Sequence, residues 1–168
     1  MILTRPKSSA RRDKRTKNPA GGAAAPINFG PLADWTGFNL RMAQASSFQA
    51  FSRLSQEVGE NPGRFATLLL ISENPGISQT MLSRANGRDK STLTPVLEDL
   101  VRRGLVKRRR THNDRRTYRL KLTPAGEKTL AKLTGCARRH ERNLDRLIGA
   151  RERKKFIAIL KRITAELG

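Results

Sequence analysis

Apolar residues recur along most of this chain at the spacing of α-helices. Between residues 35 and 58 they fall on two separate stripes of one helix, which begin at Trp35 and Leu40. Both stripes must be buried, and a chain this short has few other helices to pack against them. We therefore expect this helix to pack against a second subunit as well as against its own core.

Three shorter helices are expected next. The first covers residues 62–72, after a break at 59–63. Ser78 is placed to cap a helix over 79–85, and Asp89 to cap another over 90–103. The last of these has an unbroken apolar stripe. It also contains Pro95, which lacks an amide hydrogen and predicts a kink or a later start of the helix.

The spacing then changes from helical to alternating. Residues 105–111 and 117–122 are expected to form two strands, joined by a hairpin tip at 112–115. A long helix over about 124–148 and a last helix over 151–167 follow. The order predicts a mostly α-helical fold with a small β wing, in which a winged helix-turn-helix DNA-binding lobe is joined to a helical dimerisation region.

The charge of the chain points to a partner. Its 168 residues include 35 Lys and Arg against 14 Asp and Glu, a net charge of +21. Residues 1–31 carry +6 and few apolar side chains, which predicts a disordered basic tail ahead of a domain over 32–168. Residues 107–121, on the expected wing, carry +7. A cationic hairpin beside an amphipathic helix favours double-stranded DNA as the partner.

Several other classes of protein find little support. The longest aliphatic run, 68–71, is far shorter than the ~20 residues of a membrane-spanning helix. Cys136 is the only cysteine, which excludes an internal disulfide and a Cys-based zinc site and favours a cytoplasmic location. The sequence around His112 and His140 contains no cluster of Cys, His and carboxylate residues with metal-ligand spacing, so no metal or other cofactor is expected. No phosphate-binding loop or nucleophile motif indicates an enzyme.

Several motifs resemble those of the MarR family of winged helix-turn-helix transcription regulators. They include residues 73–79, 88–93, 97–108, 113–116 and 122–126, and they keep the family's order over about 35–167. The resemblance implies a homodimer held together by helices at about 35–58 and 124–167. Its two winged lobes, at about 62–123, would face successive major grooves of a pseudo-palindromic operator. The family's usual mode is repression.

The resemblance also implies where DNA is contacted. Asp114 would pair with an arginine and brace the hairpin, and Arg115 or a neighbour would enter the minor groove. The expected DNA-binding residues combine the start of the recognition helix with the wing: Arg88, Lys90, Ser91, Thr92, Thr94, Pro95, Arg109, Arg110, His112, Asn113, Asp114, Arg115 and Arg116.

MarR family members commonly release DNA when a small molecule binds between the dimer helices and the DNA-binding lobe. Aromatic side chains with one arginine would suit an aromatic acid or its CoA thioester as the effector. Aromatic residues at helical spacing are, taken singly, more often part of a core, so this site is a hypothesis. Its candidate residues are Trp35, Phe38, Arg41, Met42, Phe48 and Phe65.

Two alternatives stay open at this point. A non-specific, architectural nucleic-acid-binding protein would carry a similar charge, but it would not prefer one palindrome over random DNA. Some relatives sense oxidants through a cysteine near the start of the first helix. Cys136 lies instead in the long penultimate helix, where a small buried side chain is the usual finding.

Overall fold

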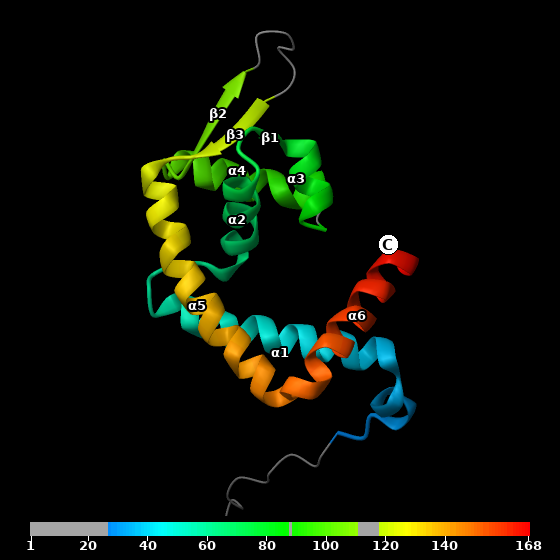
Figure 1. Cartoon of the computed structure of the whole chain (residues 1–168). Helices are drawn as coiled ribbons and strands as arrows, with labels where there is room; N and C mark the ends of the chain where they lie inside the picture. The colour runs from blue at the N-terminus through cyan, green and yellow to red at the C-terminus, as the bar shows by residue number, and fades with distance from the viewer. Residues whose placement is uncertain (1–26, 88, 111–117) are drawn as a thin grey trace, which may run out of the picture.

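A computed structural model describes residues 27–87, 89–110 and 118–168 of the chain. The part of the expected basic tail at 1–26 and the expected hairpin tip lie outside these residues. Figure 1 shows the order of the elements. They are η1 (Gly30–Asp34), α1 (Thr36–Gln56), η2 (Pro62–Arg64), α2 (Phe65–Glu73), β1 (Ile77–Ser78), α3 (Gln79–Ala85), α4 (Lys90–Arg102), β2 (Val106–Arg110), β3 (Tyr118–Leu122), α5 (Pro124–Ile148) and α6 (Ala150–Leu167).

The two longest helices, α1 and α5, lie side by side below the winged lobe (Figure 1). Polar contacts join them across their packed faces. Ser47 Oγ lies 2.9 Å from His140 Nε2, and the Cys136 thiol donates to the Leu54 carbonyl over 3.2 Å. Gly149 ends α5 with a positive φ of 86°, and α6 then turns away. The expected helix over 124–148 is confirmed.

Local capping fixes the helices of the winged lobe. The Ser78 hydroxyl accepts a hydrogen bond from the amide of Met81, and the Asp89 carboxylate accepts one from the amide of Thr92. Helix α4 begins at Lys90 and runs through Pro95. Of the two effects expected from this proline, a kink or a later start, the later start is wrong, because Asp89 caps the first turn and a proline removes only one backbone hydrogen bond.

Three antiparallel strands form the wing sheet in the order β1-β3-β2. The two hairpin strands are confirmed, with Val106 opposite Leu122 and Arg110 opposite Tyr118. The sequence did not predict β1, because two residues are too few to show an alternating pattern. Ile77 pairs with Leu120 in β3, and this pairing joins the start of α3 to the wing.

One apolar core holds the winged lobe together. Its fully buried residues come from every layer of the lobe and from the first half of α5, and Thr123 caps that helix through the amide of Gly126. Helix α4, the wing and α5 therefore share one core. The fully buried residues of this core are Leu68, Ile71, Leu82, Leu93, Leu97, Leu100, Leu120 and Leu133.

The last helix differs from the others, because none of its residues is buried. On α6, Leu167 is 84% exposed, and Phe156 and Ile159 are also exposed; nearby, at the end of α5, Leu147 is 83% exposed. The single chain therefore leaves an apolar surface on α6 uncovered. Among the helices described, none is long and apolar enough to cross a membrane.

Candidate nucleic-acid interface and effector cleft

The first turn of α4 is organised by Asp89. Its carboxylate accepts hydrogen bonds from the Ser91 hydroxyl at 2.6 Å, the Thr92 amide at 2.7 Å and the Thr92 hydroxyl at 3.2 Å. The bond from Ser91 and the two from Thr92 lower the pKa of Asp89 from 3.8 to about 2. Both hydroxyl groups therefore stand at a helix N-terminus in a fixed arrangement and keep lone pairs that can accept hydrogen bonds from base edges.

Thr94 lies on the inner side of α4. Its hydroxyl donates to the Lys90 carbonyl over 2.7 Å and accepts a hydrogen bond from Gln79 Nε2 at 2.9 Å. Thr94 thus joins the two helices of the helix-turn-helix. No local pattern predicts this contact, because Gln79 and Thr94 are fifteen residues apart. Lys90, Ser91, Thr92 and Pro95 are the exposed candidates at this end of α4.

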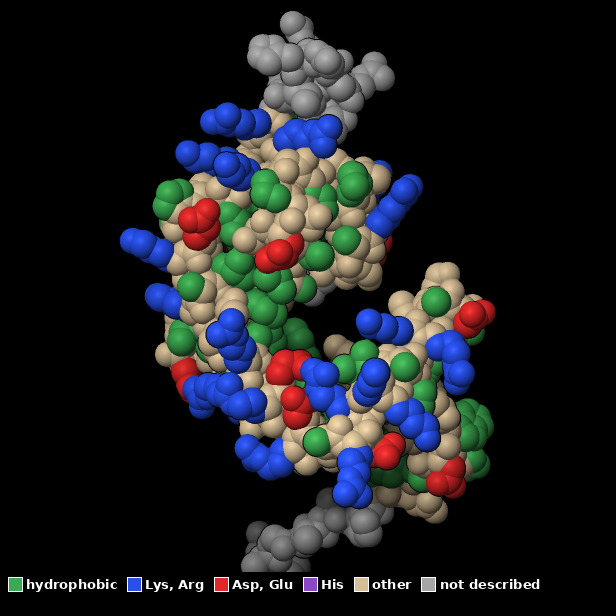
Figure 2. Space-filling view, viewed as in Figure 1, with side chains coloured by type: hydrophobic (Ala, Val, Ile, Leu, Met, Phe, Trp, Pro, Cys, Tyr) green, Lys and Arg blue, Asp and Glu red, His purple; other side chains and the backbone are tan. Residues whose placement is uncertain are grey.

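The outer face of the wing carries four exposed cationic side chains. Lys107 lies opposite Lys121, and Arg109 lies opposite Arg119. Like charges placed directly opposite one another destabilise a sheet. Such an arrangement is expected where an external anion neutralises the charge. Lys107, Arg109, Arg119 and Lys121 are called the cationic wing face below, and Figure 2 shows Lys and Arg side chains gathered beneath the grey wing tip.

Cations of the lobe divide into paired and unpaired groups. Arg102 and Arg103, at the end of α4, form ion pairs with Asp99 and Glu60. In the described part of the chain, no ion pair involves the cationic wing face, although Arg119 donates to the Gly76 carbonyl over 3.1 Å. Among the described residues, no carboxylate neutralises these four charges, and phosphate groups are the anions that such a surface would bind.

Part of the expected DNA-binding set cannot be placed. Arg88 and residues 112–116 lie outside the described residues, and of Arg110 only the backbone in β2 is described. Among the rest, Arg109 lies on the cationic wing face, and the start of α4 supplies Lys90, Ser91, Thr92 and Pro95. Sequence reasoning missed Lys107, Arg119 and Lys121. Their alternation in two paired strands was the available signal.

The structure gives the six expected effector residues different neighbours. Near the start of α1, Phe38 packs at 5.7 Å from Phe29, and the Arg41 guanidinium lies over the Phe38 ring at 5.4 Å. Trp35 and Met42 are exposed on the same half of α1. Phe65 instead packs edge-on against Phe51 at 5.6 Å, inside the fold.

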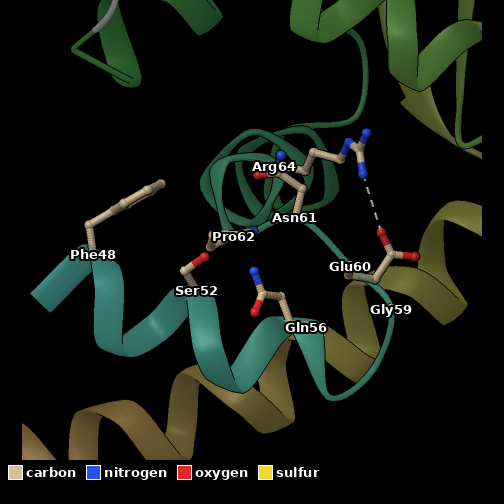
Figure 3. A pocket seen from close by; sticks show the side chains of 8 residues that line it. All are labelled: Phe48, Ser52, Gln56, Gly59, Glu60, Asn61, Pro62 and Arg64. Carbon is tan, nitrogen blue, oxygen red and sulfur yellow. Dashed lines mark ion pairs between the residues drawn. The ribbon is translucent and has the colours of Figure 1, made fainter.

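Phe48 is the candidate effector residue that borders a hollow. The hollow has a volume of about 460 Å³ and lies between α1 and the segment that leads into α2. Figure 3 shows Phe48 at one end and Glu60 at the other. Its lining is mixed, with apolar carbon, amide, carboxylate and guanidinium groups from Phe48, Ser52, Gln56, Gly59, Glu60, Asn61, Pro62 and Arg64.

The described residues also bear on whether the chain has a metal site or a reactive cysteine or histidine. They contain no group of three or more His, Cys, Asp or Glu side chains that could hold a metal ion. Cys136 is buried, and its thiol is engaged with the Leu54 carbonyl. His140 is also buried, stacked on Phe51 at 5.7 Å.

Comparison with known proteins decides the family. The MarR family model matches residues 61–118. A curated protein of Thauera aromatica, the putative transcriptional regulatory protein for the hcr operon, is 33% identical over 151 residues. The match spans 89% of this chain and 91% of that protein. This chain belongs to the MarR family. It is a DNA-binding transcriptional regulator, and not an enzyme.

Solved structures agree with this MarR fold. The transcriptional repressor CouR, bound to a 23-mer DNA duplex, has a TM-score of 0.76 and 33% identity, covering 83% of this chain and 99% of CouR. CouR bound to p-coumaroyl-CoA gives a TM-score of 0.75 at 31% identity, covering 83% and 98%. PcaV from Streptomyces coelicolor, with its natural ligand, gives 0.74 at 25% identity, covering 86% and 99%.

Proposed function

We propose that this MarR family protein is a homodimeric repressor of a pseudo-palindromic operator. We further propose that a small, hydrophobic, anionic effector releases it, and that this effector is an aromatic acid or its CoA thioester. The observation that carries the proposal is the likeness to CouR. It extends over nearly the whole CouR chain, and CouR has been solved with DNA and with p-coumaroyl-CoA.

The start of α4 and the wing support the choice of DNA site. In this proposal Ser91, Thr92 and Pro95 meet base edges in the major groove, while Lys90 and the cationic wing face neutralise phosphates. Thr94 acts from inside, by holding α4 against α3 through Gln79. The candidate residues outside the described part, Arg88, His112, Asn113, Asp114, Arg115 and Arg116, complete the proposed site together with Arg110.

The uncovered apolar surface supports the homodimer. Leu147, Phe156, Ile159 and Leu167 lie exposed towards the end of α5 and along α6, and Trp35 is exposed at the start of α1. Large apolar surfaces left open on a monomer are typical of sites where another protein binds. A two-fold dimer would set the two recognition helices one helical turn of DNA apart, ~34–36 Å, to meet the two half-sites.

The test is a binding assay with the full chain. DNA selected from a random pool gives the operator, and fluorescence anisotropy then measures affinity for the operator and for a scrambled duplex at several salt concentrations. We expect a preference of ~10³-fold or more for the operator. Addition of p-coumaroyl-CoA should weaken operator binding.

The outcomes separate the parts of the proposal. Equal affinity for both duplexes would contradict a sequence-specific repressor and favour an architectural protein. Specific binding that p-coumaroyl-CoA and aromatic acids leave unchanged would contradict the effector class alone. Release by peroxide that a Cys136→Ser variant abolishes would favour redox sensing instead.

A further inference from the structure

An ion-pair network joins the hollow beside α1 to the recognition helix. Arg64, which lines the hollow, donates to Asp99 in α4 over 2.6 Å and lies 3.6 Å from the Glu60 carboxylate. Glu60 also pairs with Arg103 at 3.2 Å, and Asp99 with Arg102 at 2.6 Å. Glu60, Arg64, Asp99, Arg102 and Arg103 are called the Arg64 network below, and Figure 3 shows its Glu60–Arg64 pair.

The network spans two parts of the fold that the chain itself connects only through intervening helices. Glu60 and Arg64 belong to the segment between α1 and α2, whereas Asp99, Arg102 and Arg103 lie at the carboxyl end of α4. Two ion pairs, Arg64 to Asp99 and Arg103 to Glu60, cross between them. A change at Arg64 therefore bears directly on how α4 is held.

The pairs of Arg64 and of Glu60 are partly buried, whereas the Arg102 side chain is 76% exposed. The Glu60 side chain is only 8% exposed, and the Arg64 and Asp99 side chains are each 22% exposed. Partly buried charges are screened less by salt and water than exposed ones. Burial alone would raise the pKa of Asp99, but hydrogen bonds from Arg64 and Arg102 lower it below its usual value.

The network as a whole holds three arginines and two carboxylates, but only Glu60 and Arg64 of its members line the hollow. Phe48 borders the same hollow at the other end. An aromatic group against Phe48 and an oxyanion against Arg64 would match the two ends. An oxyanion that binds Arg64 must compete with Asp99 and Glu60 for the same guanidinium donors.

We infer that Arg64 binds the oxyanion of the effector. Loss of the Arg64–Asp99 ion pair then loosens α4 and so weakens DNA binding. The inference rests on the proposed function, since it assumes an anionic aromatic effector. It names Arg64 in place of Arg41, whose guanidinium lies over the Phe38 ring. Coupling of this kind between two sites is typically fivefold to 150-fold in affinity.

The experiment uses the full chain and three probes: p-coumarate, p-coumaroyl-CoA and CoA alone. Calorimetry measures probe affinity, and hydrogen exchange followed by mass spectrometry reports on the amides of α4. The variants are Arg64→Gln, Arg64→Lys and Asp99→Asn. Glu57→Gln is the matched control, because Glu57 forms an ion pair of 2.6 Å with Arg139 between α1 and α5, away from α4.

Arg64→Gln should lower probe affinity at least tenfold, and Arg64→Lys should retain part of it because the charge remains. Asp99→Asn should bind the probe as tightly as wild type or more tightly, since the Asp99 carboxylate no longer competes for Arg64. Its α4 amides should exchange at least fivefold faster without any probe, and the probe should accelerate them no further. Glu57→Gln should behave as wild type.

Dependence on Arg64 for p-coumarate would identify a carboxylate as the oxyanion, and dependence for p-coumaroyl-CoA and CoA alone would identify phosphate. Either result supports the inference. Probe binding that is equal in wild type and Arg64→Gln would overturn it while leaving the proposed effector class intact. So would α4 exchange that Asp99→Asn leaves unchanged. Failure of every probe to bind wild type would refute the proposed effector class, and the inference with it.

Discussion

At the scale of single residues, Asp89 shows how a sequence signal acquires a structural meaning. An aspartate directly before an apolar-periodic segment is an N-cap in the sequence. In the fold its carboxylate also accepts hydrogen bonds from the hydroxyls of Ser91 and Thr92. Both side chains are expected to contact DNA. The cap therefore sets the orientation of the groups that it precedes.

Asp89→Ala should lower the melting temperature and make that loss depend on pH. The pKa of Asp89 is lowered to about 2 in the fold, from 3.8. Its ionised form therefore contributes stability above about pH 4, and the contribution disappears as the pH falls through 2. Thermal melts from pH 7 to pH 2 should show the gap between wild type and variant closing in acid. Glu98→Ala, on the exposed side of the same helix, is the control, and a gap that stays constant with pH would contradict the prediction.

At the scale of elements, like charges on the outer face of the wing destabilise its sheet. Lys107 opposite Lys121 and Arg109 opposite Arg119 place like charges across the strands. Each such pair raises the free energy of the fold slightly. We interpret their presence as a consequence of binding an anionic partner.

Arg109→Gln should separate stability from DNA binding. Removal of one cation from a like-charged pair should keep or raise the melting temperature. Operator affinity should fall at low salt, and the slope of log affinity against log salt should become shallower by about 0.9 if one phosphate contact is lost. Anisotropy titrations at 50–200 mM salt give the slope, with Arg142→Gln on α5 as the control. An unchanged slope would remove Arg109 from the proposed site.

The start of α5 lies very close to the backbone just before the wing. A Cβ atom on Gly126 would lie 2.1 Å from the Leu105 carbonyl oxygen, whereas Gly135 in the same helix has open space around that position. Gly126 therefore fixes how near the start of α5 lies to the beginning of the wing. A larger side chain there must displace backbone.

Opposite effects are expected from the same substitution at these two glycines. Gly126→Ala should destabilise the protein by ~1–3 kcal/mol, because the backbone must move to relieve the overlap. Gly135→Ala should stabilise it by ~0.5–1 kcal/mol, because alanine favours the helix interior. Chemical denaturation gives both free energies of unfolding. Equal effects of the two variants would mean that the close contact with Leu105 does not constrain α5.

At the scale of the whole molecule, α6 is the element that the single chain does not explain. It buries no residue, yet it carries a regular row of apolar side chains. Helix α1 also has two apolar stripes, which need a packing partner. In the proposed dimer, the second subunit would cover apolar surface on both helices.

Phe156→Asp and Leu147→Asp should convert a dimer into a monomer, because a carboxylate would be buried without a partner in the apolar interface. Sedimentation measures the mass, and operator affinity should fall in parallel because two linked half-sites become one. Met81→Asp, which alters another exposed apolar residue on α3, should leave the mass unchanged. A wild-type chain that sediments as a monomer would refute the proposed interface.

Local patterns were enough to predict much of the fold. Helical spacing, caps at Ser78 and Asp89 and the alternation after Leu105 are properties of short segments, so the sequence alone determined the order of helices and the hairpin. The charge on residues 107–121 likewise identified the wing, because a count of charges needs no knowledge of packing. Strand β1 was not predicted, because its two residues are recognised as a strand only by their pairing with β3.

Contacts between distant residues were decided only by the tertiary structure. Nothing in the sequence relates Arg64 to Asp99 or Glu60 to Arg103, because these pairs are 35 and 43 residues apart. They depend on how the segment between α1 and α2 packs against α4. For the same reason the sequence could not tell that Phe65 packs against Phe51 or that Arg41 lies over the Phe38 ring. Periodicity tells which face of an element is buried, and only packing tells which faces meet.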